Sequence, residues 1–341
     1  METKKISLAD GSGGKLTHRL IKNIFLQNLG NPILNRLDDS AICNLQSAIY
    51  NLVFTTDSYV IKPIFFPGGD IGKLSICGTI NDLSMLGARP LYISLSFILE
   101  DGLQVDKLEQ IVVSIAETAK KSGVKIVCGD TKVVEKGACD EIFINTSGIG
   151  IADKKIDISG HNAKLNDIVI LSGTIGDHGI AVLNARQKLG LRCGRCELKS
   201  DIAPLNNLVE KMIKVCGSGI HAMRDPTRGG LATALNEIAE QSNVGIEIEE
   251  STIPLKKPVE SACALLGLDP LYIANEGKLV AIVSKKDAEQ ILSVMKKHPL
   301  GKHAKIIGKV VPYPKGVFLK TKIGGTRILQ MLESDQLPRI C

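Results

Sequence analysis

Five aspartates in the first half of the chain are the residues whose type and spacing could do chemistry. Each lies at the end of an apolar segment or in a turn, and Asp57 and Asp130 are expected to end strands, where side chains leave the edge of a sheet. Carboxylates that converge on one cleft repel one another unless a cation lies between them, and Mg²⁺ held by carboxylates and substrate phosphates meets that need. A single aspartate is more commonly a cap or turn residue. We assign as metal ligands Asp38, Asp39, Asp57, Asp82 and Asp130.

A glycine-rich loop at residues 10–14 precedes a helix expected over residues 15–29. Free N–H groups at the start of a helix point outward and readily bind phosphate, although an ordinary N-terminal turn looks the same. The loop and the aspartates together, in a chain without a Walker lysine motif, favour a site for ATP and Mg²⁺. We assign to ATP binding Gly11, Gly13, Gly14, Asp57, Asp82, Asp130 and Thr131.

A helix expected over residues 71–86 carries a stripe of small and polar residues, Ser75, Gly78, Thr79 and Asp82. Their spacings of three and four place the side chains on one face of the helix. Small residues allow another backbone or a ligand to approach closely, and a buried carboxylate needs a positive partner. The same stripe fits a helix packed tightly on a sheet with Asp82 as a buried hydrogen-bond acceptor, so both interpretations stay open.

The order of the expected strands and helices around these residues predicts an α+β fold for the first half of the chain. The order strand, helix, strand, helix, strand, strand is typical of a ferredoxin-like unit. The strand that precedes Asp130 is expected to be short and buried. Strands are expected over residues 49–56, 91–98, 124–128 and 142–151, and helices over residues 71–86 and 105–121.

After a polar segment at residues 152–165 the chain resumes with an α/β pattern. At 341 residues it exceeds what one core usually holds. We therefore predict an N-terminal ATP-binding domain over residues 1–155, a C-terminal α/β domain over 156–326 and a flexible tail over 327–341. In the second half, strands are expected over 168–171, 245–249, 279–283, 304–311 and 317–320, and helices over 206–215, 230–242, 258–266 and 286–297.

The composition is that of a soluble globular protein, with 44% hydrophobic and 23% charged residues. No apolar run approaches the ~20 residues that a membrane span needs. The first residues lack the apolar core of a signal peptide, and nine cysteines lie scattered among apolar runs. These features predict a reducing, cytoplasmic location. A net charge of +6 without a basic stripe argues against nucleic-acid binding.

Motifs distributed along nearly the whole chain resemble those of the HypE family, the carbamoyl dehydratases that mature [NiFe]-hydrogenases. This family lies within the aminoimidazole ribonucleotide synthetase-like (PurM-like) ATP-binding superfamily. The acidic motifs indicate the superfamily, whereas FFPGGDIGK and the terminal cysteine are more specific to HypE. The motifs are GSGG, DDSA, TTDSYV, FFPGGDIGK, GDTKVV, RDPTRGG, NEGK and the terminal PRIC.

The resemblance implies an activity and a set of partners. Two N-terminal halves should pair into a β-barrel-like homodimer with ATP at the interface. Cys341 should receive a carbamoyl group from a HypF-like carbamoyltransferase. ATP should then drive dehydration of this S-carboxamide to a thiocyanate, and a HypC–HypD-like iron-assembly complex should accept the cyanide. Neither a nucleic acid nor a membrane is expected as a partner.

The sequence offers candidates for each role in this reaction. Glu276, in the motif NEGK, is our candidate base, because a buried glutamate with a raised pKa suits proton removal. Lys132 would stabilise the transferred phosphoryl group or orient the carboxamide. Without the resemblance, the first could be a turn carboxylate and the second a surface lysine. Arg224, Asp225 and Arg228 would line the substrate cleft, or equally form a structural ion-pair network, and His178 is expected to be a loop histidine.

The tail that carries Cys341 can be assessed from its length. A cysteine at a chain end is usually incidental, and its own α-carboxylate disfavours the thiolate. From Gly325 to Cys341, however, an extended chain could span up to roughly 50 Å. That reach suffices for movement between a partner enzyme and an internal cleft.

One motif departs from the resemblance. Cys193 and Cys196 form a CxxC that supplies only half of a structural zinc site, so we interpret it as a surface loop.

Two rival functions of the chain remain. One is another ATP enzyme of the superfamily, such as a selenophosphate synthetase-like or thiamine-monophosphate kinase-like protein; the other is a non-catalytic metallochaperone that holds metal at Cys341 and the CxxC.

Overall fold

The first half of the chain forms a five-stranded sheet with the strand order β1-β2-β7-β5-β6. Neighbouring strands are antiparallel except for β5 and β6, which run parallel. The computed structural model describes residues 6, 10, 14–44, 49–187, 189–190, 192–193, 196–333, 336–337 and 339–340. The strands are β1 (Ala41–Cys43), β2 (Tyr50–Tyr59), β5 (Arg89–Glu100), β6 (Lys125–Val134) and β7 (Ile142–Asp153).

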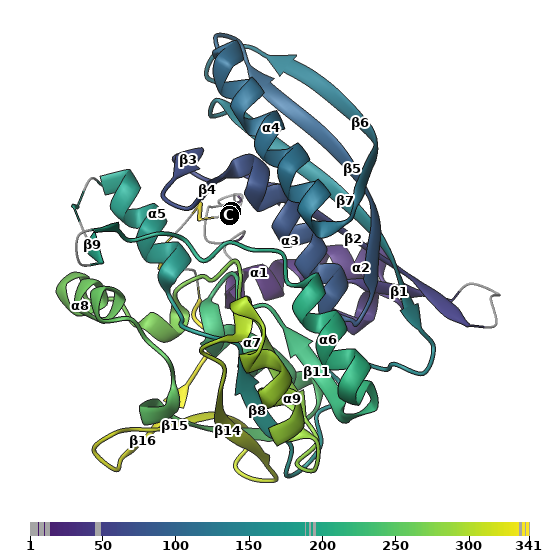
Figure 1. Ribbon diagram of the computed structural model, residues 1–341, viewed down its shortest axis with the longest axis vertical. Helices are drawn as coiled ribbons and strands as arrows, with labels where there is room; N and C mark the ends of the chain where they lie inside the picture. Colours follow the sequence, from purple (N-terminus) through teal and green to yellow (C-terminus); the bar gives the residue numbers. More distant parts are fainter. Residues whose placement is uncertain are drawn as a thin grey trace, which may run out of the picture.

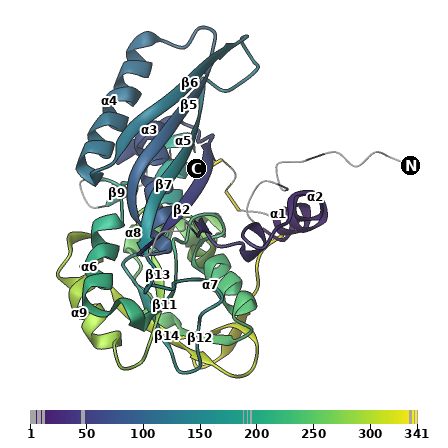
Figure 2. The same cartoon turned by 90° about the vertical axis from the view of Figure 1, so that its right-hand side faces the viewer.

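Two helices, α3 (Ile71–Met85) and α4 (Val105–Ser122), cover one face of this sheet (Figure 2). A short hairpin of β3 (Phe65–Phe66) and β4 (Gly69–Asp70) leads into α3, whose N–H groups at Gly72 and Lys73 donate to the Asp70 side chain. Such an N-cap satisfies donors that the helix itself leaves unpaired. The predicted order of strands and helices in this half is confirmed, and so is the α+β class.

The N-terminal helix is confirmed as well, although its middle turn is widened. It consists of α1 (Lys15–Leu20), a π-helical turn (Ile21–Phe25) and α2 (Leu26–Leu29), followed directly by Gly30. This helix projects from the body of the molecule in Figure 2.

The second half is built on a seven-stranded sheet with the order β11-β13-β8-β14-β12-β15-β16. Only β12 and β15 run parallel. The strands are β8 (Ile168–Leu171), β11 (Ile220–Arg224), β12 (Gly245–Glu249), β13 (Val280–Val283), β14 (Lys305–Val311), β15 (Gly316–Lys320) and β16 (Thr326–Leu329). The helices are α5 (Asp177–Gln187), α6 (Asn206–Cys216), α7 (Gly230–Gln241), α8 (Lys257–Leu266) and α9 (Ala288–Lys296), and β9 (Arg192–Cys193) pairs with β10 (Cys196–Glu197).

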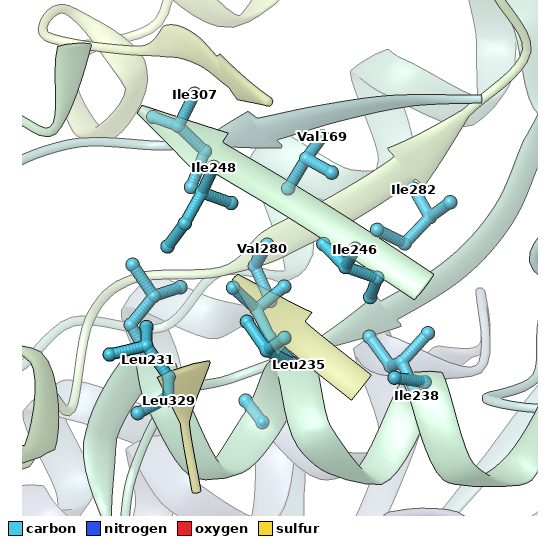
Figure 3. Close-up of a cluster of buried hydrophobic side chains, with 14 of the residues drawn as sticks. Val169, Leu231, Leu235, Ile238, Ile246, Ile248, Val280, Ile282, Ile307 and Leu329 are labelled. Atoms are coloured by element: carbon cyan, nitrogen blue, oxygen red, sulfur yellow. The ribbon is translucent and has the colours of Figure 1, made fainter. Parts of the chain in front are cut away.

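Helices lie on both sides of this second sheet (Figure 2), and strands β8, β11 and β13 are buried between two apolar layers. On one face α7 packs Leu231, Leu235 and Ile238 against Ile246 and Val280 of the sheet (Figure 3). On the other face α6 and α9 pack against β8, β11 and β13. Burial on both faces explains why β8 and β13 read as continuous apolar runs in the sequence.

Three expectations from the sequence are wrong. Strand β6 is exposed along almost its whole length, because it lies at the edge of the sheet, whereas a buried strand was predicted. Asp57 and Asp130 lie within strands β2 and β6 rather than at their ends. The predicted tail at residue 327 begins inside a strand, since β16 extends to Leu329.

The two halves are joined by polar contacts rather than by a linker alone. The carboxylate of Asp38 accepts hydrogen bonds from the Ser159 hydroxyl and the Gly160 N–H at 2.9–3.0 Å. The Asn81 side chain of the first half likewise donates to the carbonyls of Ala203 and Glu276 in the second half. None of the described helices is long and apolar enough to cross a membrane.

Candidate functional site

Carboxylates from four elements meet at the junction of the two halves. Asp39 precedes β1, Asp57 lies in β2, Asp82 lies one turn before the end of α3, and Asp225 follows β11. The Thr55 hydroxyl connects two of them, since it lies 3.0 Å from the Asp82 carboxylate and 3.2 Å from the Asp39 carbonyl. We call these four residues the acidic cluster.

The acidic cluster is electrostatically unfavourable in the protein alone. Burial, followed by repulsion from Asp225 and Asp57, raises the pKa of Asp82 well above its usual value. Burial and the neighbouring Asp39 do the same to the pKa of Asp225, whose Oδ2 is buried without a hydrogen-bond partner among the described residues. Burial raises the pKa of Asp39 to about 6, against the attraction of Arg224. A bound cation would relieve this repulsion.

The carboxylates of the acidic cluster fit a Mg²⁺ ion shared with phosphate better than a metal ion that is bound by protein side chains alone. Among the described residues, no three histidine, cysteine, aspartate or glutamate side chains already surround a point where an ion could sit. Mg²⁺ usually takes one or two carboxylates and completes its shell with water and phosphate oxygens. The acidic cluster supplies carboxylates of that kind, and the substrate phosphates would supply the rest.

Two arginines balance part of this charge. Arg224 is buried and forms ion pairs with Asp39 and, at 3.2 Å, with Glu237 of α7. Arg228 lies 3.6 Å from the Asp57 carboxylate. Arg224 and Arg228 therefore form the ion pairs of the alternative interpretation, whereas Asp225 belongs to the acidic cluster, and the cleft role of all three stays a prediction.

Glu276 lies beside the acidic cluster in a rigid loop. Its backbone N–H donates to Asp201 at 3.2 Å, and its carbonyl accepts from the Asn81 side chain and from the Ala203 N–H. Its Oε1 is buried and has no hydrogen-bond partner among the described residues. Burial, and then repulsion from Asp225 and Asp201, raises its pKa well above the usual range. A hydrogen-bonded backbone and a carboxylate oxygen without a partner suit a general base.

The end of the C-terminal tail lies close to this loop. Ile340 is buried in the same apolar cluster as Ala274, two residues before Glu276. His178 of α5 is fully buried and its Nε2 lies 2.9 Å from the Ile340 carbonyl oxygen, so it is not the loop histidine that was expected. Cys341 lies outside the described residues.

Asp130, Thr131 and Lys132 do not join the acidic cluster within one chain. Asp57 of β2 is paired with Thr146 of β7, Thr146 with Leu95 of β5, and Leu95 with Gly129 of β6. Asp57 and Gly129 therefore lie three strand spacings apart, or roughly 14 Å. The next residue of β6, Asp130, therefore points to the opposite face of the sheet. There Lys132 pairs with Asp130 at 3.2 Å, and both side chains are exposed.

Two further predicted ligands are engaged elsewhere. Asp38 uses its carboxylate to join the two halves, and it also accepts from Arg36 at 3.1 Å. Gly14 is the N-cap of α1, but the N–H groups of Lys15 and Leu16 donate to the carbonyls of Leu332 and Glu333. In this arrangement those N–H groups are not available to a phosphate. Gly11 and Gly13 lie outside the described residues.

The stripe of small and polar residues on α3 packs the helix on the sheet and also carries a carboxylate of the acidic cluster. Gly78 lies against the Tyr59 hydroxyl and Thr79 contacts Thr146 of β7, so these residues pack the helix tightly on the sheet. Asp82, at the end of the same stripe, belongs to the acidic cluster. The helix therefore sets the position of the carboxylate through its close packing.

Gly78→Ala is expected to destabilise the protein by about 1–3 kcal/mol, because an added methyl overlaps the buried Tyr59 hydroxyl. Urea unfolding at neutral pH measures this. Gly325→Ala is the matched control, since a methyl there meets only the Thr321 hydroxyl, at 3.3 Å. Adding Tyr59→Phe removes the closest atom and should recover part of the loss. Equal stabilities of the two alanine variants would contradict this account of the packing.

Sequence reasoning missed Asn81 and Asp201, which hold the loop of Glu276 in place, and the contact between His178 and the tail. Asn81 adjoins Asp82 in the sequence, which is the one local signal that could have suggested it. Cys193 and Cys196 are paired across the β9–β10 hairpin, but their side chains lie outside the described part of the structure.

Comparison with known proteins identifies the family. Residues 37–152 match the N-terminal domain model of the AIR synthase related proteins, and residues 164–320 match the C-terminal domain model. A carbamoyl dehydratase HypE from Bradyrhizobium diazoefficiens is 47% identical, with 98% of this chain and 96% of that protein covered. HypE from Escherichia coli is 46% identical, with 98% and 99% covered.

Solved structures agree with these relatives. A crystal structure of HypE in complex with ATP aligns with a TM-score of 0.82 at 48% identity and covers 99% of this chain and 100% of the other. A HypE–HypF complex aligns with a TM-score of 0.85 at 50% identity and covers 92% and 99%. These similarities over nearly the full length show that the chain belongs to the HypE family of carbamoyl dehydratases, within the AIR synthase related proteins.

Proposed function

We propose that this chain is an ATP-dependent carbamoyl dehydratase that acts on the S-carboxamide of its own Cys341. The product is a thiocyanate, which supplies the cyanide ligand for the iron of [NiFe]-hydrogenase. The observation that carries the proposal is the docking of Ile340 in the same apolar cluster as Ala274, two residues before Glu276, whose Oε1 is buried without a hydrogen-bond partner among the described residues. Family membership supports the same activity, because relatives of this sequence are carbamoyl dehydratases.

Dehydration of a carboxamide requires a better leaving group than oxide. Transfer of the γ-phosphoryl group of ATP to the carboxamide oxygen releases ADP and turns that oxygen into part of a phosphate. Glu276 removes a proton from the nitrogen, the C–O bond breaks, and loss of the second N–H proton completes the C≡N triple bond. The sum is S-carboxamide plus ATP giving thiocyanate, ADP and phosphate.

The acidic cluster is the proposed cation site. Asp39, Asp57, Asp82 and Asp225 would hold Mg²⁺, which supplies charge neutralisation for the phosphates during phosphoryl transfer. Arg228, near Asp57, adds positive charge on the same side of the cleft. Arg224 fixes Asp39 and so keeps one carboxylate of the set in place.

We infer that the protein acts as a homodimer. The sheet of the first half leaves the face opposite α3 and α4 largely uncovered, and Phe54, Tyr92 and Ile98 are each more than 40% exposed there (Figure 2). The unpaired edge of β6 adjoins this face. A second copy that covered both would bury these side chains and would bring its own Asp130, Thr131 and Lys132 to the interface, where ATP would be shared between the copies.

The proposed partners follow from the chemistry and the family. A HypF-like carbamoyltransferase would load Cys341, as the known HypE–HypF complex of a relative suggests. A HypC–HypD-like complex would accept the cyanide. Both steps need the tail to leave its docked position.

Intact-mass spectrometry tests the proposal directly. The chain is carbamoylated with the carbamoyltransferase and then given ATP and Mg²⁺. The carbamoylated mass should fall by one water, and neither Cys341→Ser nor a sample with chelator in place of Mg²⁺ should show this loss. Complete carbamoylation without any loss of water in the presence of ATP and Mg²⁺ would refute the proposed function.

A further inference from the structure

Asn81 lies on α3, one residue before Asp82 of the acidic cluster, and its side chain is fully buried. Consecutive residues of a helix point about 100° apart around its axis, so α3 can direct Asp82 to the cluster and Asn81 to a different neighbour. Figure 1 shows α3 extending from the first half of the molecule towards α6 of the second. Met85, the last residue of α3, is buried in the same apolar cluster as Leu208 and Met212 of α6. The end of α3 is therefore packed against the second half.

The amide of Asn81 is bonded to the second half at both of its ends. Its Oδ1 accepts from the Leu205 N–H at 2.8 Å. Its Nδ2 lies 3.2 Å from the Ala203 carbonyl oxygen and 3.3 Å from the Glu276 carbonyl oxygen. An N–H can only donate and a carbonyl oxygen can only accept, so these partners determine which end of the amide is which. One side chain of the first half therefore holds two separate segments of the second, residues 203–205 and the loop of Glu276.

Asn275 connects the loop of Glu276 to the acidic cluster. Asn275 is fully buried, and its N–H and its Nδ2 each donate to the Pro226 carbonyl at 3.0 Å. The Asn275 Oδ1 accepts from the Gly176 N–H at 2.8 Å. Pro226 directly follows Asp225, which is a member of the cluster. The backbone just before Glu276 is therefore fixed relative to one carboxylate of the cluster.

Gly277 and Lys278 fix the other side of the loop to Asp201. A Cβ at Gly277 would overlap the Asp201 carbonyl oxygen, so the close approach requires glycine. Lys278 Nζ lies 3.0 Å from the Asp201 carboxylate, and both side chains are largely buried. The same carboxylate accepts from the Glu276 N–H at 3.2 Å. These contacts hold the backbone and leave the Glu276 Oε1 without a hydrogen-bond partner among the described residues.

We propose that Asn81 is a positioning residue for the dehydration, and that α3 fixes the proposed base relative to the proposed cation site. The helix supplies Asp82 to the cation, and through Asn81 it holds the carbonyl of Glu276. A movement that separated α3 from this loop would break the contact, and a misplacement of about 1 Å can cost roughly 100-fold in rate. The positioning role rests on the proposed function, whereas the link between the two halves does not.

Amide hydrogen exchange tests the link without ATP or any partner. In the unmodified chain the Leu205 amide, relative to its intrinsic rate, should exchange at least about tenfold more slowly than the Asn207 amide. Asn207 is the second residue of α6, where the helix itself provides no acceptor. Asn81→Ala should abolish most of this difference, because it removes the acceptor of the Leu205 N–H. Equal exchange at the two positions in the unmodified chain would overturn the link.

Single-turnover dehydration of the carbamoylated chain tests the positioning role. At saturating ATP, Asn81→Ala should slow the loss of water by about 10- to 100-fold. The ATP concentration that gives half the maximal rate should stay within about twofold, because the hydrogen bonds of Asn81 go to the loops of the second half. Ser84→Ala is the matched control and should change neither quantity. Ser84 is equally buried on α3, but its hydroxyl donates to the Ile80 carbonyl of the same helix.

Gly277→Ala displaces the loop of the base without altering α3, and it serves where Asn81→Ala does not fold. It should slow dehydration at saturating ATP to a similar extent, since its methyl pushes against the Asp201 carbonyl. Normal rates in both variants, with exchange at Leu205 altered as expected, would refute the positioning role alone. A carbamoylated chain that never loses water, even in its unmodified form, would refute the proposed function and with it the role of Asn81.

Discussion

Glu276→Gln is expected to lower the rate of dehydration by about 10²- to 10⁴-fold while transfer of the carbamoyl group to Cys341 proceeds normally. Glutamine has the same shape, so the hydrogen bonds of the residue 276 backbone to Asp201, Asn81 and Ala203 remain. Only the ability to take a proton is lost, because Oε1 is buried without a partner among the described residues. Single-turnover intact-mass measurements with ATP give the rate.

Glu289→Gln on the exposed side of α9 is the matched control and should keep the full rate. A rate for Glu276→Gln within about threefold of the unmodified chain, far below the usual contribution of a general base, would exclude Glu276 from that role.

The same variant should alter how stability depends on pH. Burial raises the pKa of Glu276, so the folded chain binds this proton more tightly than the unfolded chain does. The free energy of unfolding of the unmodified protein therefore falls as pH rises from the ordinary glutamate range through the folded-state pKa. Glutamine does not titrate, so Glu276→Gln should gain stability relative to the unmodified protein as pH rises. Urea unfolding at pH 5.5 and pH 8 measures the difference.

Arg224→Met is expected to cost about 3–5 kcal/mol of unfolding free energy, the largest effect on stability that we predict. The Arg224 side chain is only 8% exposed and pairs with both Asp39 and Glu237. It also donates to the Leu37 carbonyl at 2.9 Å. Methionine fills much of the space but leaves Asp39 without its counter-ion and Glu237 with only its contact to His18. Urea unfolding at pH 7.5 gives the change.

Arg327→Met is the control for removing an arginine from an ion pair. Arg327 is half-exposed beside Asp269, and exposed pairs contribute at most about 1 kcal/mol.

The effect of Arg224→Met should also depend on pH. Burial already raises the pKa of Asp39 to about 6, and loss of Arg224 would raise it further. The deficit of Arg224→Met should therefore shrink below pH 6, where Asp39 is protonated, and Asp39→Asn should rescue part of it. A deficit of the same size in both arginine variants would contradict the buried network.

The secondary structure followed largely from local sequence. Helices expected over residues 71–86 and 105–121 end within one residue of α3 and α4, because their apolar spacing and their terminal signals are local properties. Strands β8 and β13 were found for a related reason, since strands buried on both faces are continuous apolar runs. The five-residue strand β11 was missed, because its residues merged with the loop that carries Arg224.

Burial could not be predicted in the same way. Residues 124–128 are apolar except for Lys125, as in a central strand, yet β6 lies at an edge, because strand order depends on pairings between distant segments. This placement also separates Asp130 and Lys132 from Asp57 and Asp82 within one chain.

By itself the sequence determined the kind of chemistry: aspartates for a cation, a glutamate flanked by glycine, and a terminal cysteine within a recognisable set of motifs. Only the tertiary structure decided which carboxylates meet, because Asp39, Asp82 and Asp225 come from elements far apart in the chain. It also decided that Asp38 joins the two halves, and that His178 contacts the tail. The physical reason is that residue types and local spacing are written along the chain, whereas proximity and burial arise only when distant segments pack together.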